Sequence, residues 1–245
     1  MRAYLDLPYV ENACDMQKLD IHLPEKESFD TLIWLHGGGL ETGGRKDGDY
    51  PQAVTNAGYA FASIEYRMYP NARFPDYLED AANAIAYLLK KLPELGGNGR
   101  VFLMGESAGA YMTMMLLMDP QYFAKAGISQ ENITGFISDS AQQFCHFRVL
   151  KEMGMDSRLE RINERAPIYF IREGLKIRPL LLMYYENDMK CRPEETRLIY
   201  ASFKQLMPEA RVELHELPGG HCSRPKAADG SHLMLSRAFE FMRSI

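Results

Sequence analysis

Short runs of hydrophobic residues alternate along the chain with longer segments in which hydrophobic residues recur at helical spacing. Short apolar runs are typical of strands buried on both faces, and their alternation with helices is typical of βα units that form a largely parallel sheet. The pattern therefore predicts an α/β fold. We expect strands at residues 18–22, 31–35, 59–64, 100–104, 135–138, 179–185 and 212–217.

The clearest helical pattern covers residues 76–92, which lie between Pro75 and Pro93. Proline at the first turn or just beyond the last is a usual boundary of a helix. Residues 108–118 are hydrophobic on nearly all sides, as expected of a helix that packs inside the fold. We expect two further helices, at 194–207 and 231–244.

Residues 139–178 interrupt the regular alternation, because they are too many for a simple crossover between two strands. No repeat, low-complexity tract or linker divides the chain, so we expect one domain over residues 1–245. The long segment is either an enlarged crossover or a cap. The cap is favoured because open α/β sheets bind ligands at the carboxyl ends of their strands. The segment holds four aromatic candidates for substrate contacts: Phe144, Phe147, Tyr169 and Phe170.

The sequence Gly-Glu-Ser-Ala-Gly, residues 105–109, lies between an expected strand and the internal helix. In this context it is typical of a nucleophile elbow, a sharp strand-to-helix turn whose small flanking residues let neighbouring backbone approach. The turn would hold the Ser107 hydroxyl above the sheet edge, beside the N–H groups at the helix N-terminus. Ser107 is therefore the candidate nucleophile.

Three glycines, residues 37–39, follow His36 just after the strand expected at 31–35. Glycines expose backbone N–H groups without side chains in the way, and acyl transfer requires such donors for the oxyanion of its tetrahedral intermediate. This loop is the candidate source of those donors. His36 itself is expected to hold the loop rather than to carry a proton.

A serine nucleophile requires a histidine base, and the base requires an orienting carboxylate. In chain order the acid and then the histidine must follow the elbow serine. Asp188 comes directly after the strand expected at 179–185, and His221 comes directly after the strand expected at 212–217. Both would lie at the sheet edge that carries Ser107, so they are the candidate acid and base.

The sequence leaves alternatives open for both roles. Glu186 is a competing acid in the same loop as Asp188. His215, inside an expected strand, and His232, in the last expected helix, are competing bases, although such positions are more typical of packing or surface residues.

With these motifs in place, the chain resembles the carboxylesterase and lipase branch of the α/β-hydrolase superfamily. That branch includes the hormone-sensitive-lipase-like group and the small feruloyl or acetyl esterase groups. The similarity runs from about Leu19 to the C-terminus. It rests on His-Gly-Gly-Gly at 36–39, the elbow at 105–109, the Asp188 and His221 loops, and the pairs Tyr66-Arg67, Phe74-Pro75 and Glu79-Asp80.

The resemblance implies an α/β-hydrolase fold with a largely parallel sheet, helices on both faces, and a small cap, 139–178, between strands 6 and 7. It implies that the oxyanion hole consists of the N–H groups of Gly38, Gly39 and Ala108. It also implies a structural role for Arg67 and Asp80, beneath the oxyanion loop.

Two departures from the family pattern affect the interpretation. Ala110 follows the elbow where many relatives carry a second glycine, which is expected to change only the packing of the helix. The N-terminal segment is too short to form the large lid of the lipase-like members. We therefore do not expect long-chain lipase activity, and we expect residues 139–178 to determine substrate choice.

Composition excludes several classes of function. The formal net charge of −5 gives no reason to bind nucleic acid or an anionic membrane. The first twenty residues show no signal-peptide or membrane-span pattern, so we expect a cytoplasmic protein. Homo-oligomer formation remains open.

Four scattered cysteines, Cys14, Cys145, Cys191 and Cys222, lack metal-ligand spacing. We therefore expect free thiols, no metal and no other cofactor. Cys191 and Cys222 lie in the loops of Asp188 and His221, so a redox-sensitive pair is an alternative to two unrelated thiols.

These features predict a serine carboxylesterase that hydrolyses small, short-acyl esters through an acyl-enzyme intermediate, with acylated carbohydrates as the expected natural class. One alternative is a formamidase or other amidase with the same triad. Another is a catalytically silent hydrolase fold that serves as a binding module.

Overall fold

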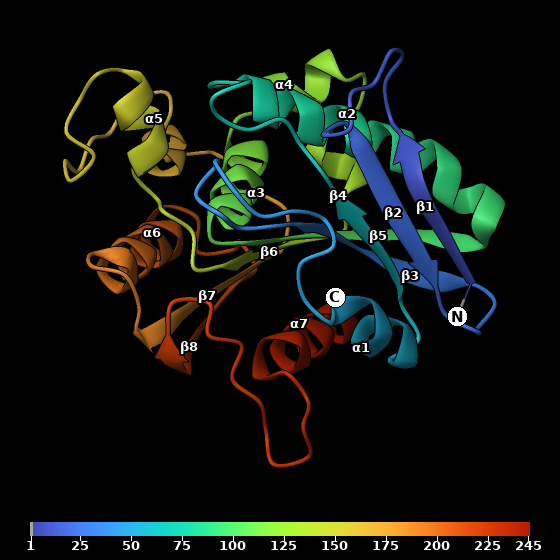
Figure 1. The fold of residues 1–245 in the computed structure, drawn as a ribbon. Helices are drawn as coiled ribbons and strands as arrows, with labels where there is room; N and C mark the ends of the chain where they lie inside the picture. Colours follow the sequence, from blue (N-terminus) through green and yellow to red (C-terminus); the bar gives the residue numbers. More distant parts are fainter. Residues whose placement is uncertain (1) are drawn as a thin grey trace.

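The computed structural model describes residues 2–245. Within these residues, eight strands form one sheet in the order β1-β2-β4-β3-β5-β6-β7-β8 (Figure 1). The pairs β1–β2 and β2–β4 are antiparallel, and all other neighbours run parallel. The strands are β1 (Arg2–Pro8), β2 (Lys18–Leu23), β3 (Phe29–Leu35), β4 (Ala60–Ile64), β5 (Gly97–Glu106), β6 (Gly135–Asp139), β7 (Leu180–Asn187) and β8 (Val212–Gly220).

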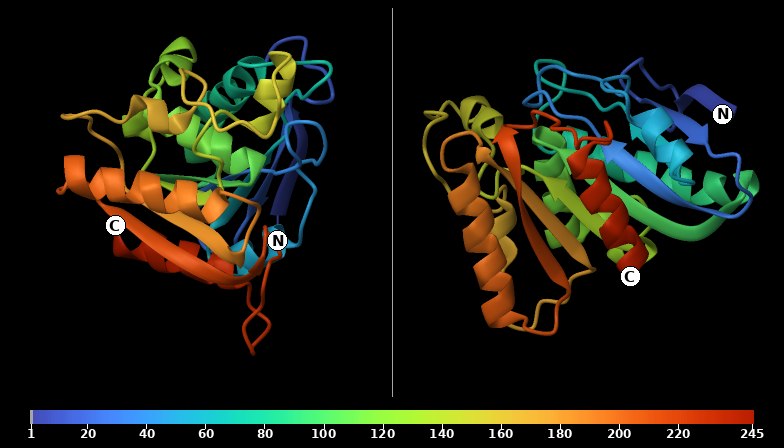
Figure 2. Two further views of the ribbon diagram at one scale, coloured as in Figure 1. Left: turned by 90° about the vertical axis from the view of Figure 1, so that its left-hand side faces the viewer. Right: turned by 90° about the horizontal axis from the view of Figure 1, so that it is seen from below.

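Helices cover both faces of the sheet, and each layer has its own hydrophobic cluster. The larger cluster includes side chains of α2 (Asp76–Lys91), α3 (Ala108–Met118) and α6 (Arg192–Leu206). The smaller one includes side chains of α1 (Tyr50–Asn56) and α7 (Leu233–Ser244), which lie together in Figure 1 and in the left view of Figure 2. This mostly parallel sheet between two helical layers confirms the predicted α/β-hydrolase fold.

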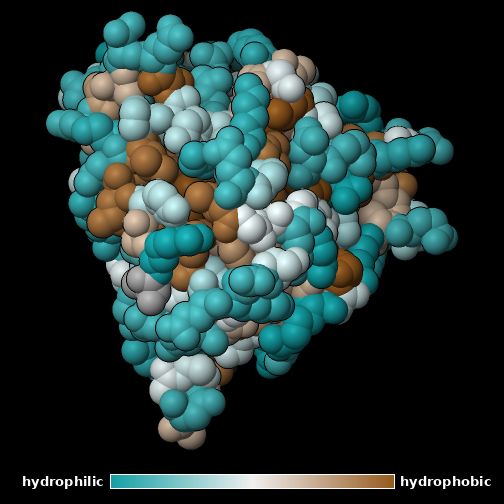
Figure 3. Space-filling model, turned by 90° about the vertical axis from the view of Figure 1, so that its right-hand side faces the viewer, coloured by the Kyte–Doolittle hydropathy of each residue, from teal (hydrophilic) through white to brown (hydrophobic). Residues whose placement is uncertain are grey.

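Shorter elements complete the chain: α4 (Gln121–Lys125), α5 (Phe147–Glu152) and 3₁₀ turns at Leu92–Leu95, Gln130–Asn132 and Pro167–Phe170. The pattern did not predict these pieces, nor α1, because one or two turns are too short to show helical periodicity. It also missed β1, whose residues are all exposed or half-buried. Figure 3 shows the side of the molecule on which this edge strand lies, where hydrophobic patches are broken up by hydrophilic side chains.

All seven expected strands are present, but two helix starts were wrong. α6 begins at Arg192 rather than at residue 194, because Pro193 fits the first turn, where its missing N–H is not needed. α7 begins at Leu233 rather than at residue 231, because the Ser231 hydroxyl is bonded to Asp229 in a preceding turn.

Two glycines set how closely α3 packs against the sheet. A side-chain carbon added to Gly105 would lie 2.1 Å from the carbonyl oxygen of Gly109. One added to Gly109 would lie 2.1 Å from the carbonyl oxygen of Leu35, at the end of β3. Only glycine allows this approach, so the turn between β5 and α3 lies directly against the end of β3.

Residues 139–178, which contain α5, pack over α3 and over the loop that follows β3. The Tyr111 hydroxyl of α3 donates to the carbonyl oxygen of Arg165 at 2.7 Å. The Phe147 ring lies 3.0 Å from where a side-chain carbon of Gly39 would be, and Arg148 forms an ion pair with Glu41. These contacts place the segment, which we call the cap, against α3 and the loop after β3.

The first turn of α6 fixes the chain directly after β6. The buried Arg192 donates from Nη1 to the carbonyl oxygen of Ser140 at 3.0 Å. One turn later, the buried Glu195 accepts the N–H groups of Gln143 at 2.6 Å and of Phe144 at 3.1 Å. Burial raises the pKa of Glu195 to about 7, although Arg192 and the two N–H donors act in the opposite direction.

We predict that Glu195→Gln removes a pH-dependent loss of stability. Because the carboxyl pKa is higher in the folded chain, the folded state holds this proton to higher pH than the unfolded state does. Stability from this group is therefore present below pH 4.5 and lost as the pH rises to about 7, by roughly 3 kcal/mol. Urea unfolding between pH 4.5 and 8 measures the difference between wild type and variant.

Glu194→Gln is the matched control, because Glu194 is the exposed neighbour of Glu195 in the same turn. It should leave the pH dependence of stability unchanged. Parallel stability curves for wild type and Glu195→Gln would show that Glu195 is ionised normally in the folded chain.

Candidate active site

Ser107 occupies the turn between β5 and α3 with φ 55° and ψ −112°. A positive φ is strained for a residue that has a side chain, so neighbouring contacts must hold it. The Ser107 N–H donates to the carbonyl oxygen of Asp139 at 2.8 Å, and its carbonyl oxygen accepts the N–H of Tyr111 at 2.9 Å. The end of β6 and the first turn of α3 thus fix the elbow from two sides.

The structure brings Ser107, His221 and Asp188 into one hydrogen-bonded row. The Ser107 Oγ lies 2.8 Å from His221 Nε2, and His221 Nδ1 lies 2.5 Å from Asp188 Oδ1. The Asp188 side chain is fully buried, whereas that of His221 is 22% exposed. The histidine can therefore accept the serine proton at Nε2 while Nδ1–H donates to the carboxylate.

Several donors hold the Asp188 carboxylate in its charged form. Burial alone would raise the pKa of Asp188, but the hydrogen bonds from His221 and Ser140 outweigh it and hold the pKa below its usual range. The backbone N–H groups of Tyr185 and Met189 also donate to this carboxylate, at 3.1 and 2.7 Å. An ionised carboxylate at this position can orient the imidazole and stabilise its protonated form.

The alternative candidates for the acid and the base lie away from Ser107. Glu186 is exposed at the end of β7. His215 lies on β8 at 3.8 Å from Glu213, and His232 precedes α7 at 2.8 Å from Asp49. The geometry therefore places His221 and Asp188, and neither of the two other histidines nor Glu186, beside Ser107.

The glycine loop lies against Ser107. A side-chain carbon on Gly37 would be 3.3 Å from the Ser107 Cβ. Gly38 and Gly39 have φ of 105° and 66°, which glycine adopts without strain. Within residues 2–245, no acceptor is hydrogen-bonded to the N–H groups of Gly38, Gly39 or Ala108. These groups are thus available to bind an oxyanion.

Polar contacts hold His36, the residue before the glycine loop, and a separate ion pair involves Arg67. The His36 ring stacks on Tyr66 at 4.2 Å between centroids, and its Nε2 lies 3.1 Å from Glu65 Oε1. Arg67, which follows Tyr66, forms a bidentate ion pair with the buried Asp80, with N···O distances of 2.8 and 2.9 Å. These contacts agree with the structural role expected for His36 and, from the resemblance, for Arg67 and Asp80.

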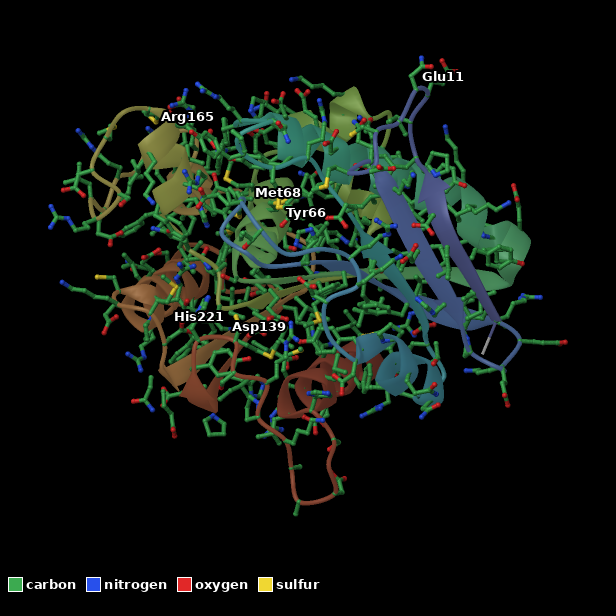
Figure 4. The ribbon with its side chains drawn as sticks, in the orientation of Figure 1. Glu11, Tyr66, Met68, Asp139, Arg165 and His221 are labelled. Atoms are coloured by element: carbon green, nitrogen blue, oxygen red, sulfur yellow. The ribbon has the colours of Figure 1, made fainter. Side chains whose placement is uncertain are left out.

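A second buried network, which the sequence did not indicate, lies beneath the elbow. Glu106 accepts the Tyr50 hydroxyl at 2.8 Å and Arg224 Nη2 at 3.1 Å. Because Arg224 is three residues beyond His221, this ion pair ties the base loop to the residue before Ser107. Figure 4 labels Asp139 and His221, which come from the ends of β6 and β8.

A cavity of about 560 Å³ lies between the cap and the start of α6. Phe147 lines it and also packs against the glycine loop at Gly39. Its other lining residues are Gln142, Ser157, Arg158, Glu160, Met189, Lys190, Cys191, Arg192 and Glu195. The other aromatic candidates do not line this cavity: Tyr169 and Phe170 form an edge-to-face pair, and the backbone of Phe144 binds Glu195.

All four cysteines are free thiols. The Cys222 Sγ lies 3.7 Å from His221 Nε2, whereas Cys191 lines the cap cavity. Within residues 2–245 there is no cluster of three or more side chains suited to hold a metal ion. The same part of the chain has no helix with the length and hydrophobicity needed to cross a bilayer.

Comparison with known proteins gives relatives that are named esterases. A probable isoprenylcysteine alpha-carbonyl methylesterase of Arabidopsis thaliana is 26% identical over 125 residues, covering 47% of this chain and 26% of that protein. Esterase LipC of Mycobacterium tuberculosis is 24% identical over 212 residues, covering 78% of this chain and 52% of that protein. The chain thus spans between about a quarter and a half of the length of these curated relatives.

Solved structures support the fold. A truncated carbohydrate esterase from gut microbiota superposes with a TM-score of 0.79 at 14% identity, covering 100% of this chain and 96% of that one. A butyrate-bound esterase of Thermogutta terrifontis superposes with a TM-score of 0.77 at 19% identity, covering 99% and 93%. At such identities the likeness concerns the fold alone.

The most direct assignment comes from the sequence profile of the BD-FAE family. The profile matches residues 19–143, which include the glycine loop, the Arg67–Asp80 pair and the elbow. The match covers more than half of the 245 residues, and we conclude that the chain belongs to the BD-FAE family.

Proposed function

We propose that the protein is a serine carboxylesterase whose triad is Ser107, His221 and Asp188. The observation that carries the proposal is the 2.8 Å contact between Ser107 Oγ and His221 Nε2 at a strained strand-to-helix turn. A serine hydroxyl is a weak nucleophile unless an adjacent base removes its proton. The named esterases among the relatives agree with this chemistry.

The reaction proceeds in two halves. His221 Nε2 accepts the proton of Ser107 as Oγ attacks the ester carbonyl, and Asp188 stabilises the imidazolium. The N–H groups of Gly38, Gly39 and Ala108 bind the oxyanion, a contribution of about 3–4 kcal/mol for each donor. The protonated His221 then gives its proton to the leaving alcohol, and a water activated by the same histidine hydrolyses the acyl-enzyme.

The substrate class follows from the cavity beside the oxyanion loop. Its lining includes the apolar side chains of Phe147 and Met189 and the charged side chains of Arg158, Glu160 and Lys190. Such a mixed lining suits a compact substrate with one apolar face and several hydroxyl groups. We therefore propose small, short-acyl esters, with acylated carbohydrates as the natural class.

For the triad, we predict that Ser107→Ala and His221→Ala each lower kcat on p-nitrophenyl acetate by roughly 10⁴-fold or more, because the two residues act as a unit. Asp188→Asn should lower kcat less than either. Steady-state kinetics of the purified variants, with circular dichroism to verify folding, provides the measurement.

Glu186→Gln is the matched control, because Glu186 is an exposed carboxylate two residues before Asp188. Its kcat should equal that of the wild type. A large loss in Glu186→Gln together with a normal Asp188→Asn would reverse the assignment of the acid.

For the acyl group, we predict that esters of two to four carbons have a higher kcat/KM than esters of eight or more carbons on the same leaving group. Each added CH₂ contributes about 0.8 kcal/mol only where an apolar channel buries it. Charged side chains line the cap cavity, so a long chain would meet them instead. A series of p-nitrophenyl esters measures the profile, and a steady rise through the eight-carbon ester would show that a long acyl channel exists.

A further inference from the structure

Ser140, the residue directly after β6, lies between the two strands that supply the nucleophile and the acid. β6 is hydrogen-bonded to β5 on one side and to β7 on the other. Ser140 is fully buried and has φ 64°. Its N–H donates to the carbonyl oxygen of Met183 at 2.8 Å, and its carbonyl oxygen accepts Arg192 Nη1 at 3.0 Å. The backbone at this residue is therefore fixed on both sides.

The side chain of Ser140 bridges the candidate acid and base. Its Oγ lies 2.5 Å from Asp188 Oδ2 and 2.9 Å from His221 Nδ1. A hydroxyl has one proton to donate and lone pairs to accept. An ionised carboxylate can only accept, so the Ser140 proton goes to Asp188 Oδ2 and a lone pair of Oγ faces the Nδ1–H of His221.

This bridge restricts both partners. Donation to Oδ2 fixes the rotation of the carboxylate, which leaves Oδ1 to face the ring at 2.5 Å. The lone pair beside Nδ1 favours the tautomer with its proton on Nδ1, and that tautomer leaves Nε2 able to accept from Ser107. The contact with the ionised Asp188 carboxylate is charge-assisted, and the Ser140 and Asp188 side chains are both buried, a setting that strengthens this hydrogen bond.

We propose that Ser140 is a positioning residue of the hydrolase site, whose hydroxyl locks Asp188 and His221 in the arrangement that directs Nε2 to Ser107. The inference rests on the proposed function of Ser107, His221 and Asp188. Ser140 touches neither substrate nor the attacking oxygen and acts through the other two residues.

A purely structural role makes a different prediction. If the turn after β6 needed only the left-handed backbone, glycine would serve as well as serine or better, because it adopts φ near 64° without strain. Ser140→Gly and Ser140→Ala both remove the hydroxyl, but only the alanine variant keeps the backbone strain. Comparing the two variants therefore separates the effect of losing the hydroxyl from the effect of backbone strain in the turn.

The experiment compares both variants with wild type on p-nitrophenyl acetate. We expect kcat to fall by about ten- to a hundredfold in both, the change that corresponds to losing one hydrogen bond to a charged group, while KM stays the same. The melting temperature of Ser140→Gly should be at least that of Ser140→Ala. Ser138→Ala is the matched control, since Ser138 is a buried serine of β6 whose hydroxyl has no hydrogen-bond partner among the described residues, and its kcat should be normal.

A second readout needs no substrate. The His221 Nδ1–H forms a short hydrogen bond to Asp188. It should therefore give a far-downfield proton NMR signal in the resting protein, and this signal should be absent from His221→Ala. We expect this signal to shift or broaden in Ser140→Gly and to persist unchanged in Ser138→Ala.

The outcomes separate this inference from the proposed function. Wild-type kcat and an unchanged downfield signal in Ser140→Gly would overturn the role of Ser140 while leaving the triad intact. A wild type that hydrolyses no ester would instead reject the proposed function. The NMR comparison then decides alone whether Ser140 orders the Asp188–His221 pair.

Discussion

The close packing of backbone at the elbow is the constraint on which the rest of the site depends. Gly105 lies against the carbonyl oxygen of Gly109, and Gly109 lies against that of Leu35, at distances that admit no side chain. This contact holds the start of α3 at the end of β3. The loop that follows β3 therefore meets the proposed nucleophile, with Gly37 close to the Ser107 Cβ. One packing contact thus places both the serine and the proposed oxyanion donors.

The proposed base, His221, and the proposed acid, Asp188, follow the more distant strands β8 and β7, and polar contacts fix their positions relative to the elbow. Arg224 connects the His221 loop to Glu106, the residue before Ser107. Ser140 connects the end of β6 to Asp188 and His221. Arg192, on α6, holds the carbonyl oxygen of Ser140. Because removal of one partner leaves a buried polar group unsatisfied, such contacts fix geometry strongly.

From the sequence, the fold could be predicted and Ser107, His221 and Asp188 could be proposed as the triad, because each depends on local or ordered information. The elbow is a contiguous motif, and Asp188 and His221 each follow a strand whose carboxyl end must lie at the same edge. The sequence named Asp188 as the candidate acid and left Glu186 as a competitor. Their three-dimensional positions separate the two, because the Asp188 side chain is buried whereas Glu186 is exposed.

Other parts of the site could not be predicted because they depend on contacts that form only when distant segments of the chain come together. Ser140 is one serine among many in the sequence, and its contacts form only when β6 lies between β5 and β7. Phe147 was one of four aromatic candidates in the cap, and only its packing on Gly39 distinguishes it from Tyr169 and Phe170. β1 was missed because an exposed edge strand has no hydrophobic pattern to detect.

The central claim is that His221 makes Ser107 the nucleophile of the folded protein. Its most direct test is reaction of the resting protein with a fluorophosphonate probe, followed by peptide mapping with mass spectrometry. The account predicts a single adduct on Ser107 that requires the folded state and is absent from His221→Ala. No adduct on the folded wild type, or an adduct on another residue such as Ser140, would contradict it.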